Sequence, residues 1–315
     1  MEEIPKHSRD VPDVLYIAGY GRSGSTVLDV LLGGHPRVVS VGELVFLGSD
    51  WQSEDRQCAC GEPYEDCPFW KGLFKDSRKV NSLERVVREV EHRHALPKLL
   101  FDSHAEEEKR DYRHRTRKLF KYIAQQGSAD LIVDSSKSGR QAAGRFWALK
   151  NVAGLDVRVL HLVRDGRAAL QSVLEKGSNW ALEGHIEEKR WLGARTTIGW
   201  VLANAIALGL GRSLGSDRYH RVKFENLLRA PEETLRGIGD FADVDLGPVI
   251  RRVARDEAFK VGHNVGGNRI RHRRQIRLEK TDMPNPHPWS DLNSHHQILF
   301  AAFGQWLNAA LGYEW

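Results

Sequence analysis

The clearest chemistry in this sequence lies at residues 14–28, which read VLYIAGYGRSGSTVL. A short apolar run typical of a β-strand leads into a loop rich in glycine and hydroxyl residues, and an apolar helix start follows. The backbone N–H groups of such a turn, together with the positive end of the next helix, bind an anion without needing a particular side chain. The pattern therefore predicts a phosphate-binding loop between a strand and a helix.

One residue separates this loop from that of the nucleotide hydrolases, which reads G-x-x-x-x-G-K-[ST]. Gly19, Gly24 and Thr26 fall in that register, but Ser25 stands where the lysine belongs. That lysine reaches the β- and γ-phosphates of a triphosphate, so its absence argues against ATP or GTP hydrolysis. The cation lies earlier, at Arg22, which suits a nucleotide with a single 5′-phosphate.

A second candidate phosphate site follows the apolar run at 157–163. Arg164 comes directly after this run, and Ser172 follows eight residues later on a predicted helix. A guanidinium and a hydroxyl near a helix N-terminus can form charge-assisted hydrogen bonds to a dianion. The alternative is a local ion pair between Arg164 and Asp165. Taken alone, an arginine followed by an aspartate at a strand end more often forms such an ion pair.

Together these motifs resemble the sulfotransferase superfamily, whose 5′-phosphosulfate loop has the pattern [KR]-x-G-[ST]-[ST]. Here the pattern is Arg22-Ser23-Gly24-Ser25-Thr26. The resemblance spans the chain from Val14 to about Arg271 and is to bacterial members. It implies a P-loop-like nucleotide-binding fold and transfer of a sulfuryl group from 3′-phosphoadenosine 5′-phosphosulfate (PAPS), with 3′,5′-ADP as the product.

The resemblance also implies which residues hold PAPS. Those expected at its 5′-phosphosulfate are Arg22, Ser23, Gly24, Ser25, Thr26 and Val27, and those expected at its 3′-phosphate are Arg164 and Ser172.

Two later segments complete the implied donor site. Residues 222–227 are similar to the family's YEDL segment, whose tyrosine lies by the adenine; Phe224 keeps the ring without the hydroxyl. We expect Glu225 to order this loop rather than to touch the ligand. Residues 263–271 resemble a bacterial H-x-x-x-G-N-x-x-R loop that folds over the donor, with Asn268 and Arg271 as contacts.

Sulfuryl transfer requires a base for the acceptor hydroxyl and cations for the oxygens around sulfur. Glu43, in SVGEL, stands where carbohydrate- and tyrosyl-type members carry a glutamate base. Cytosolic small-molecule members use a histidine in a later motif, and the matching segment here, residues 134–137 (DSSK), has none. We therefore expect Glu43 as the base, with Lys137 and Arg22 stabilising the oxygens and no metal. The structural alternatives are a helix-start carboxylate for Glu43 and a solvated loop cation for Lys137.

Three cysteines, Cys58, Cys60 and Cys67, lie close together in CACGEPYEDCPFW. A Cys-x-Cys pair with a third cysteine suggests zinc, but a structural site takes four ligands and no fourth is near in sequence. We therefore expect reduced thiols in a tight loop, with a single disulfide as the next alternative and no catalytic role.

Apolar runs typical of strands must position these motifs. They recur at Val14–Ala18, Val38–Val41, Leu131–Val133, Val157–Val163 and Tyr219–Phe224, with helical patterns between them. This alternation predicts an α/β fold, a three-layer αβα sandwich around a parallel sheet. Ligands of such sheets bind beyond the carboxyl ends of the strands, which is where the motifs fall.

Helical periodicity marks the segments between and after these runs. One helix is expected around Leu83, Val86, Val87 and Val90, and another buries Tyr112, Leu119, Phe120 and Ile123, with their charged residues on a solvated face. A long helix at 190–210 is expected to bury a stripe of Trp191, Ala194, Ile198, Val201, Leu202 and Ala205, and a last helix spans about 291–311. We expect a single domain at 12–315 with a helical insertion at 76–128. The segment 262–288 is too long for a simple turn, so we expect it to be functional or disordered.

The whole chain has 315 residues and a formal charge of +5, with a pI near 9.1. This mild basic excess suits an anionic donor or acceptor as well as nucleic acid; the basic hexamer RIRHRR alone is weak evidence for nucleic-acid binding. No window holds the ~18 uninterrupted apolar residues of a membrane span. We expect a cytoplasmic enzyme without stable membrane insertion, acting on a glycan, glycolipid or hydroxylated metabolite. The rival functions are a P-loop kinase or ATPase, and a non-catalytic nucleotide or nucleic-acid binding module.

Overall fold

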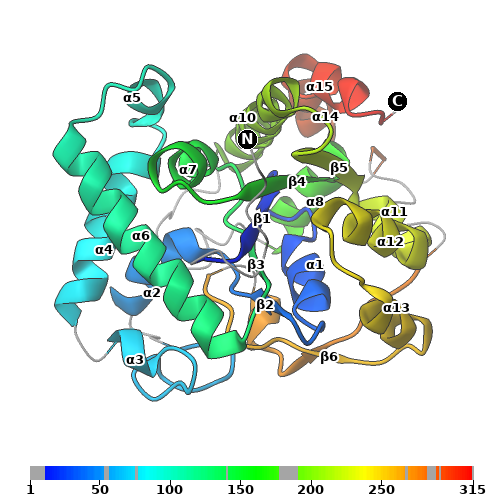
Figure 1. The fold of residues 1–315 in the computed structure, drawn as a ribbon. Helices are drawn as coiled ribbons and strands as arrows, with labels where there is room; N and C mark the ends of the chain where they lie inside the picture. Colours follow the sequence, from blue (N-terminus) through cyan, green and yellow to red (C-terminus); the bar gives the residue numbers. More distant parts are fainter. Residues whose placement is uncertain are drawn as a thin grey trace.

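A five-stranded parallel sheet forms the centre of the molecule in the computed structural model (Figure 1). The structure describes residues 11–52, 57–74, 77–139, 141–176, 191–266, 269–281, 289–290 and 292–313. The strands are β1 (Asp13–Ala18), β2 (Val38–Ser40), β3 (Leu131–Asp134), β4 (Val157–Val163) and β5 (Tyr219–Lys223), in the order β2-β3-β1-β4-β5. All five lie within a residue or two of the runs expected from the sequence, so the predicted α/β class is confirmed.

Alternate residues of the strands face two different cores, because successive side chains of a strand point to opposite faces. Val14, Tyr16 and Val159 belong to one core, whereas Leu15 and Leu160 belong to the other. The first core is covered by α4 (Ser77–Glu91) and α6 (Glu106–Gly127), and the second by α1 (Ser25–Leu32), α12 (Pro231–Ala242) and α13 (Gly247–Ala254). The result is the expected three-layer sandwich.

Further helices and two short strands surround these elements. They are α2 (Leu47–Gln52), α3 (Lys71–Phe74), α5 (Leu96–Leu100), α7 (Arg145–Trp147), α8 (Gly166–Lys176), α11 (Phe224–Arg229), β6 (Phe259–Lys260) and β7 (Gln275–Ile276), with single turns at Leu44–Phe46, Ala148–Val152 and Arg269–His272. Strands β6 and β7 pair antiparallel, so part of the long segment at 262–288 is ordered.

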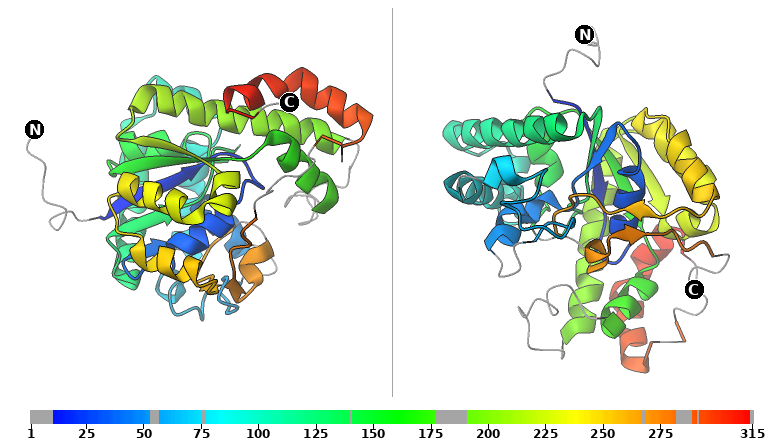
Figure 2. Two further views of the ribbon diagram at one scale, coloured as in Figure 1. Left: turned by 90° about the vertical axis from the view of Figure 1, so that its right-hand side faces the viewer. Right: turned by 90° about the horizontal axis from the view of Figure 1, so that it is seen from below.

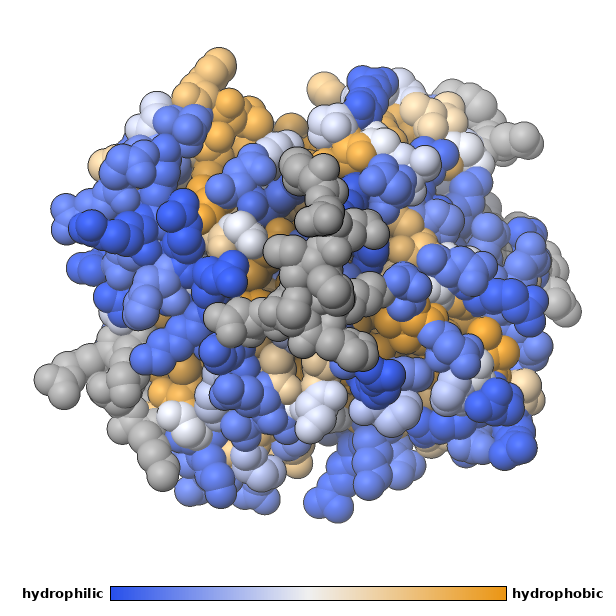
Figure 3. Space-filling view, in the orientation of Figure 1, coloured by the Kyte–Doolittle hydropathy of each residue, from blue (hydrophilic) through white to orange (hydrophobic). Residues whose placement is uncertain are grey.

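Helices α4 and α6 confirm the periodicity read from the sequence. Tyr112, Leu119, Phe120 and Ile123 are buried on α6, as expected. Most charged residues of these helices lie outside, apart from the buried Glu91 at the end of α4, and the surface over them is largely hydrophilic (Figure 3). The charged residues thus form a solvated face, as expected from the sequence.

The stripe expected on the long helix α10 (Leu192–Leu214) was wrong. Trp191, Ile198 and Leu202 are 62%, 49% and 55% exposed, Ala205 is also exposed, and Ala194 and Val201 are only half-buried. The buried face instead carries mainly small or polar residues (Gly193, Thr196, Thr197, Ala203, Asn204 and Ala207), together with Trp200 and Leu210. Asn204 Oδ1 lies 2.9 Å from Nε2 of the buried His161 on β4. Because α10 is apolar on most sides, its apolar content could not indicate which face is buried. The contact between Asn204 and His161, together with close packing, determines the buried face.

Helix α10 is the one helix among the described residues that is long and apolar enough to cross a membrane. Core helices of globular proteins meet the same criterion, and α10 contacts α8, α14 (Ser294–Phe303) and strands β1, β4 and β5. Figure 2 shows it running beside α14 and α15 (Gln305–Ala310). The last helix expected from the sequence is thus two helices, which meet at Gly304.

Candidate active site

The phosphate-binding loop lies where the sequence predicts it, between the end of β1 and the start of α1. Gly19 and Gly24 have φ values of 127° and 82°, and Arg22 lies at 67°, so the loop makes a sharp left-handed turn before Ser25 begins α1. Glycine is required at position 24, because a Cβ there would lie 2.1 Å from the Phe224 ring. The loop and Phe224 are therefore packed directly together.

Polar side chains of the loop are held inside the molecule. Ser23 and Ser25 are buried, and Ser23 Oγ has no hydrogen-bond partner among the described residues. A buried hydroxyl without a partner is costly, so this group fits a ligand acceptor such as a phosphate or sulfate oxygen. Thr26 and Val27 are half-buried in the first turn of α1.

Arg164 emerges from β4 onto this loop. Its Nη1 donates to the carbonyl of Arg22 at 3.0 Å, and its guanidinium lies 5.5 Å from the centre of the Phe224 ring. Burial lowers the pKa of Arg164 from its usual range, but this guanidinium stays charged at neutral pH. Two residues expected at opposite ends of the donor, Arg22 and Arg164, are thus brought together with Phe224.

The helix after Arg164 offers fewer open backbone groups than expected. Asn308 Oδ1 accepts from the Gly166 N–H at 2.9 Å, and the Asp165 carboxylate accepts from the Arg167 N–H at 2.9 Å. The Asp165 carboxylate also forms an ion pair with the Arg167 guanidinium at 2.6 Å. A local ion pair is therefore present here, and its cation is Arg167. Any anion bound here must therefore rely on side chains, and Ser172 lies half-buried two turns along α8.

Glu43 and Lys137 form a buried ion pair. Lys137 Nζ donates to Glu43 Oε1 across 94 positions of sequence, and their side chains are 12% and 8% exposed. Glu43 is thus more than a helix-start carboxylate, and Lys137 is no solvated loop cation. A carboxylate and an ammonium group are thus in contact at the carboxyl edge of the sheet.

The backbone around Lys137 is tied to the phosphate-binding loop. Lys137 has a φ of 67°, and its N–H donates to the carbonyl of Ile17 at the end of β1 at 3.1 Å. The next N–H, of Ser138, donates to the carbonyl of Gly19 at 3.0 Å, and Ser138 Oγ accepts from the Gly19 N–H. Lys137 is therefore positioned by the same strand end that carries the loop.

A buried charge network holds the segment before Lys137. Asp134, at the end of β3, accepts from Arg145 Nε at 2.7 Å and from the Ser136 N–H at 3.0 Å. Arg145 in turn pairs with Glu91 of α4 at 2.5 Å. Removing one partner of such a buried set would leave an uncompensated charge and destabilise this edge of the sheet.

Glu43 is held from the far side by a segment that sequence reasoning did not connect to it. Its N–H donates to the carbonyl of Val265 at 2.7 Å, and the Val265 N–H donates to the carbonyl of Val41 at 2.9 Å. Beside it, the Asn264 amide donates to the buried carboxylate of Asp29 on α1, which also accepts from Ser40 Oγ at 2.5 Å. Burial raises the pKa of Asp29 to about 7. A lone acid among the apolar residues of α1 was the signal for this contact.

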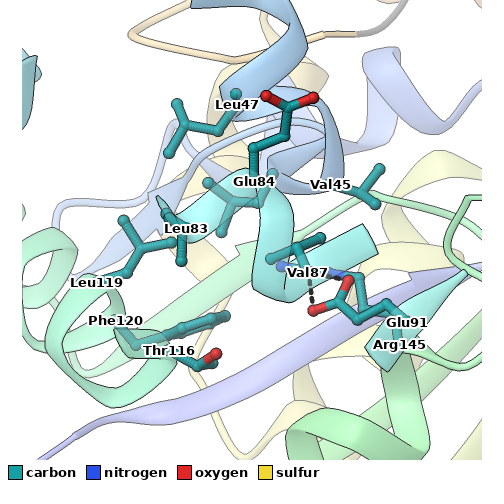
Figure 4. Close-up of a pocket in the computed structure, with 12 residues that line it drawn as sticks. Val45, Leu47, Leu83, Glu84, Val87, Glu91, Thr116, Leu119, Phe120 and Arg145 are labelled. Atoms are coloured by element: carbon teal, nitrogen blue, oxygen red, sulfur yellow. Dashed lines mark hydrogen bonds and ion pairs between the residues drawn. The ribbon is translucent and has the colours of Figure 1, made fainter. Parts of the chain in front are cut away.

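A small hollow lies next to Glu43, between residues 44–48 and helices α4 and α6 (Figure 4). Leu83, Leu119 and Phe120 line it, and the Glu91–Arg145 pair closes one end. Its volume of about 10 Å³ holds at most one water molecule. It is therefore no acceptor site.

Three further residues from the sequence analysis are Glu225, Arg271 and Asn268. Glu225 has the structural role expected of it: Oε1 accepts from the Asp165 N–H at 3.0 Å and Oε2 from the Tyr313 hydroxyl at 2.7 Å. Arg271 is half-buried in the turn at 269–272, with its Nε 3.3 Å from His272 Nε2. Asn268 lies outside the described residues.

Comparison with known proteins identifies a family and a shared fold. Residues 13–248 match the model of a family described as the sulfotransferase family. A search of the curated proteins gave no match. Among solved structures, the sulfotransferase domain from the curacin biosynthetic pathway is 19% identical with a TM-score of 0.52, covering 96% of this chain and 99% of that one. Sulfotransferase STF9 from Mycobacterium avium is 16% identical with a TM-score of 0.53, covering 98% and 79%. At these identities the likeness shows a shared fold.

Proposed function

The chain belongs to the sulfotransferase family, and we propose that it transfers a sulfuryl group from PAPS to an acceptor hydroxyl. The observation that carries this proposal is the buried Glu43–Lys137 pair, tied through Lys137 and Ser138 to the loop that lacks the lysine of nucleotide hydrolases. A base and a cation beside an anion-binding loop are what an in-line transfer to a hydroxyl requires.

The residues present fit the donor. The unpartnered Ser23 hydroxyl and the tight turn at Gly24 suit its 5′-phosphosulfate, together with Arg22, Ser25, Thr26 and Val27. Arg164 and Ser172 are assigned to the 3′-phosphate, and the Phe224 ring to the adenine. Asn268 and Arg271 are assigned to the donor on the resemblance alone. When bound, PAPS supplies the sulfuryl group.

The protein's own groups have separate tasks in this proposal. Glu43 accepts the proton of the acceptor hydroxyl through its carboxylate. Lys137 and Arg22 stabilise the negative charge on the oxygens around the transferred group. In the free protein the Lys137 ammonium is balanced by Glu43, so both groups are kept in place inside a nearly dry site. The transfer itself calls for no metal.

The acceptor belongs to a broad class. A glycan, a glycolipid or a hydroxylated metabolite fits a glutamate base, with the glutamate favouring a carbohydrate. We propose a cytoplasmic enzyme that acts without nucleic acid and without stable membrane insertion, in one domain at 12–315 whose helices at 76–128 form an insertion.

A transfer assay tests this function. The protein is incubated with ³⁵S-labelled PAPS and a fractionated extract of its host, and labelled products are identified by mass spectrometry, with Glu43→Gln in parallel. We expect a labelled product and free 3′,5′-ADP with the wild-type chain and neither with the variant. Transfer of label from γ-³²P-ATP, with none from PAPS, would support the kinase alternative instead.

A further inference from the structure

The three cysteines meet a fourth potential ligand, which comes from a segment distant in sequence. His263 Nδ1 lies 3.2 Å from Cys67 Sγ and 3.7 Å from Cys58 Sγ, although His263 and Cys67 are 196 positions apart in sequence. Cys60 Sγ lies 3.7 Å from Cys67 Sγ. The four potential ligand atoms all lie within 4.8 Å of one another. The expectation of an incomplete ligand set, which rested on sequence proximity, was wrong.

The three distances of 3.2–3.7 Å are close to those between the ligands of a tetrahedral metal site, and no pair of ligand atoms is more than 4.8 Å apart. Zinc bonds of about 2.3 Å to sulfur and about 2.05 Å to nitrogen place two sulfurs about 3.8 Å apart, and a sulfur and a nitrogen about 3.5 Å apart. A disulfide instead requires sulfurs about 2.05 Å apart, and all three cysteines are free thiols here. The spacing therefore favours a shared cation over a covalent bond.

The ligands are also held in place by the surrounding backbone and rings. The Cys58 N–H donates to the carbonyl of Glu62 at 2.9 Å, and the Cys67 N–H to that of Pro63 at 2.8 Å, so the cysteine loop closes on itself. The His263 ring stacks on Phe69 at 5.2 Å, and its carbonyl accepts from Trp70 Nε1 at 2.8 Å. The histidine is thus docked by the two aromatic residues that follow Cys67.

We propose that Cys58, Cys60, Cys67 and His263 bind one structural Zn²⁺. Three thiolates and an imidazole form a ligand set typical of structural zinc, and four protein ligands leave no open position for a substrate or an activated water. The site is thus separate from the transfer chemistry.

Its position indicates what the metal holds together. The two residues after His263 are Asn264, which donates to Asp29, and Val265, which accepts from the N–H of Glu43 at 2.7 Å. The metal therefore fastens the segment that supports the catalytic edge to the cysteine loop. Its loss is expected to release residues 262–266 and so to disturb the support of Glu43.

Metal analysis of the full chain tests the site without reference to activity. The protein is purified in a reductant without any histidine tag, and its zinc is measured by mass spectrometry, with release by a thiol-blocking mercurial as a second measurement. We expect about one Zn²⁺ per chain, and replacement by Co²⁺ should give the visible absorption of a tetrahedral thiolate site. Release of zinc should track modification of the thiols.

Variants assign the ligands. Cys60→Ser removes the most exposed cysteine and His263→Ala the distant ligand, and each should lower bound zinc well below one per chain. His94→Ala, an exposed histidine elsewhere, is the matched control and should leave zinc unchanged. Circular dichroism and size exclusion establish whether each variant is folded.

A folded wild-type chain with three reduced thiols that neither contains Zn²⁺ nor takes up added Zn²⁺ or Co²⁺ overturns the proposal. A disulfide among these cysteines in protein prepared under reductant overturns it as well. Both measurements use the wild-type chain, so their results remain valid even if the variants fail to fold.

Discussion

At the scale of single residues, the site depends on charges placed where water is excluded. Glu43 and Lys137 neutralise one another in a buried pair, and Arg164 is positioned by the backbone of the loop it is expected to serve. The residue types of all three were evident in the sequence, because each follows an apolar strand. The contact between Glu43 and Lys137 was not, because it joins two loops whose strands are neighbours only in the folded sheet.

Replacing the proposed base should remove turnover and leave binding intact. Glu43→Gln keeps the size of the side chain but cannot accept the proton, so kcat is expected to fall by about 10²–10⁴-fold. Initial rates with the acceptor found in the transfer assay, and calorimetric titration with 3′,5′-ADP, separate the two effects. Glu175→Gln, on the exposed side of α8, is the control. Unchanged kcat in Glu43→Gln would assign the base elsewhere.

Arg164→Ala should weaken the binding of 3′,5′-ADP more than that of 5′-AMP. A charged hydrogen bond contributes about 1.5–3 kcal/mol, so the loss is expected to be about 10–150-fold for the 3′-phosphorylated nucleotide. The control is Arg158→Ala on the same strand, because Arg158 pairs with Asp13 near the opposite end of β4. An equal loss for both nucleotides would leave Arg164 a role in the loop but none at the 3′-phosphate.

At the scale of elements, near-continuous apolar runs identified the five strands, because strands of a parallel sheet are buried on both faces. The face of α10 could not be predicted in the same way. Its buried side is fixed by Asn204 against His161 and by close packing, and large apolar residues such as Trp191 lie outside. Apolar content therefore predicts which elements form, whereas buried polar pairs determine which face of a helix such as α10 is buried.

The contact between α1 and the segment after His263 should make stability depend on pH. Burial raises the pKa of Asp29 from 3.8 to about 7, so the folded state favours the protonated acid. The free energy of unfolding contributed by this group therefore falls as pH rises from about 4 to about 7. A difference of one pKa unit between the folded and unfolded states changes the free energy of unfolding by about 1.4 kcal/mol.

Asp29→Asn removes this titration. The free energy of unfolding of the variant should equal that of the wild type near pH 4 and exceed it increasingly as the pH rises to about 8. Urea unfolding at a series of pH values measures the difference, and Asp240→Asn on the exposed side of α12 is the control. A difference between Asp29→Asn and wild type that stays constant with pH would contradict the assignment.

At the scale of the whole molecule, segments that are distant in sequence meet at one edge of the sheet. Residues 263–265 reach the cysteine loop, Asp29 and Glu43 together. The sequence motif around His263 was noted, but its resemblance assigned roles to Asn268 and Arg271 only. No local spacing could have joined His263 to Cys67, so the fourth ligand was accessible only from the fold.

We expect this fold to select a nucleotide with phosphates at both the 3′ and 5′ positions. Thermal unfolding with 3′,5′-ADP, 5′-AMP and ATP with Mg²⁺ compares the three ligands directly. A ligand at a hundredfold excess over its Kd adds about 2.7 kcal/mol, so we expect a clear rise in Tm with 3′,5′-ADP and smaller rises with the other two. A rise with ATP and Mg²⁺ and none with 3′,5′-ADP would mean that the site binds a triphosphate and not a 3′-phosphorylated donor.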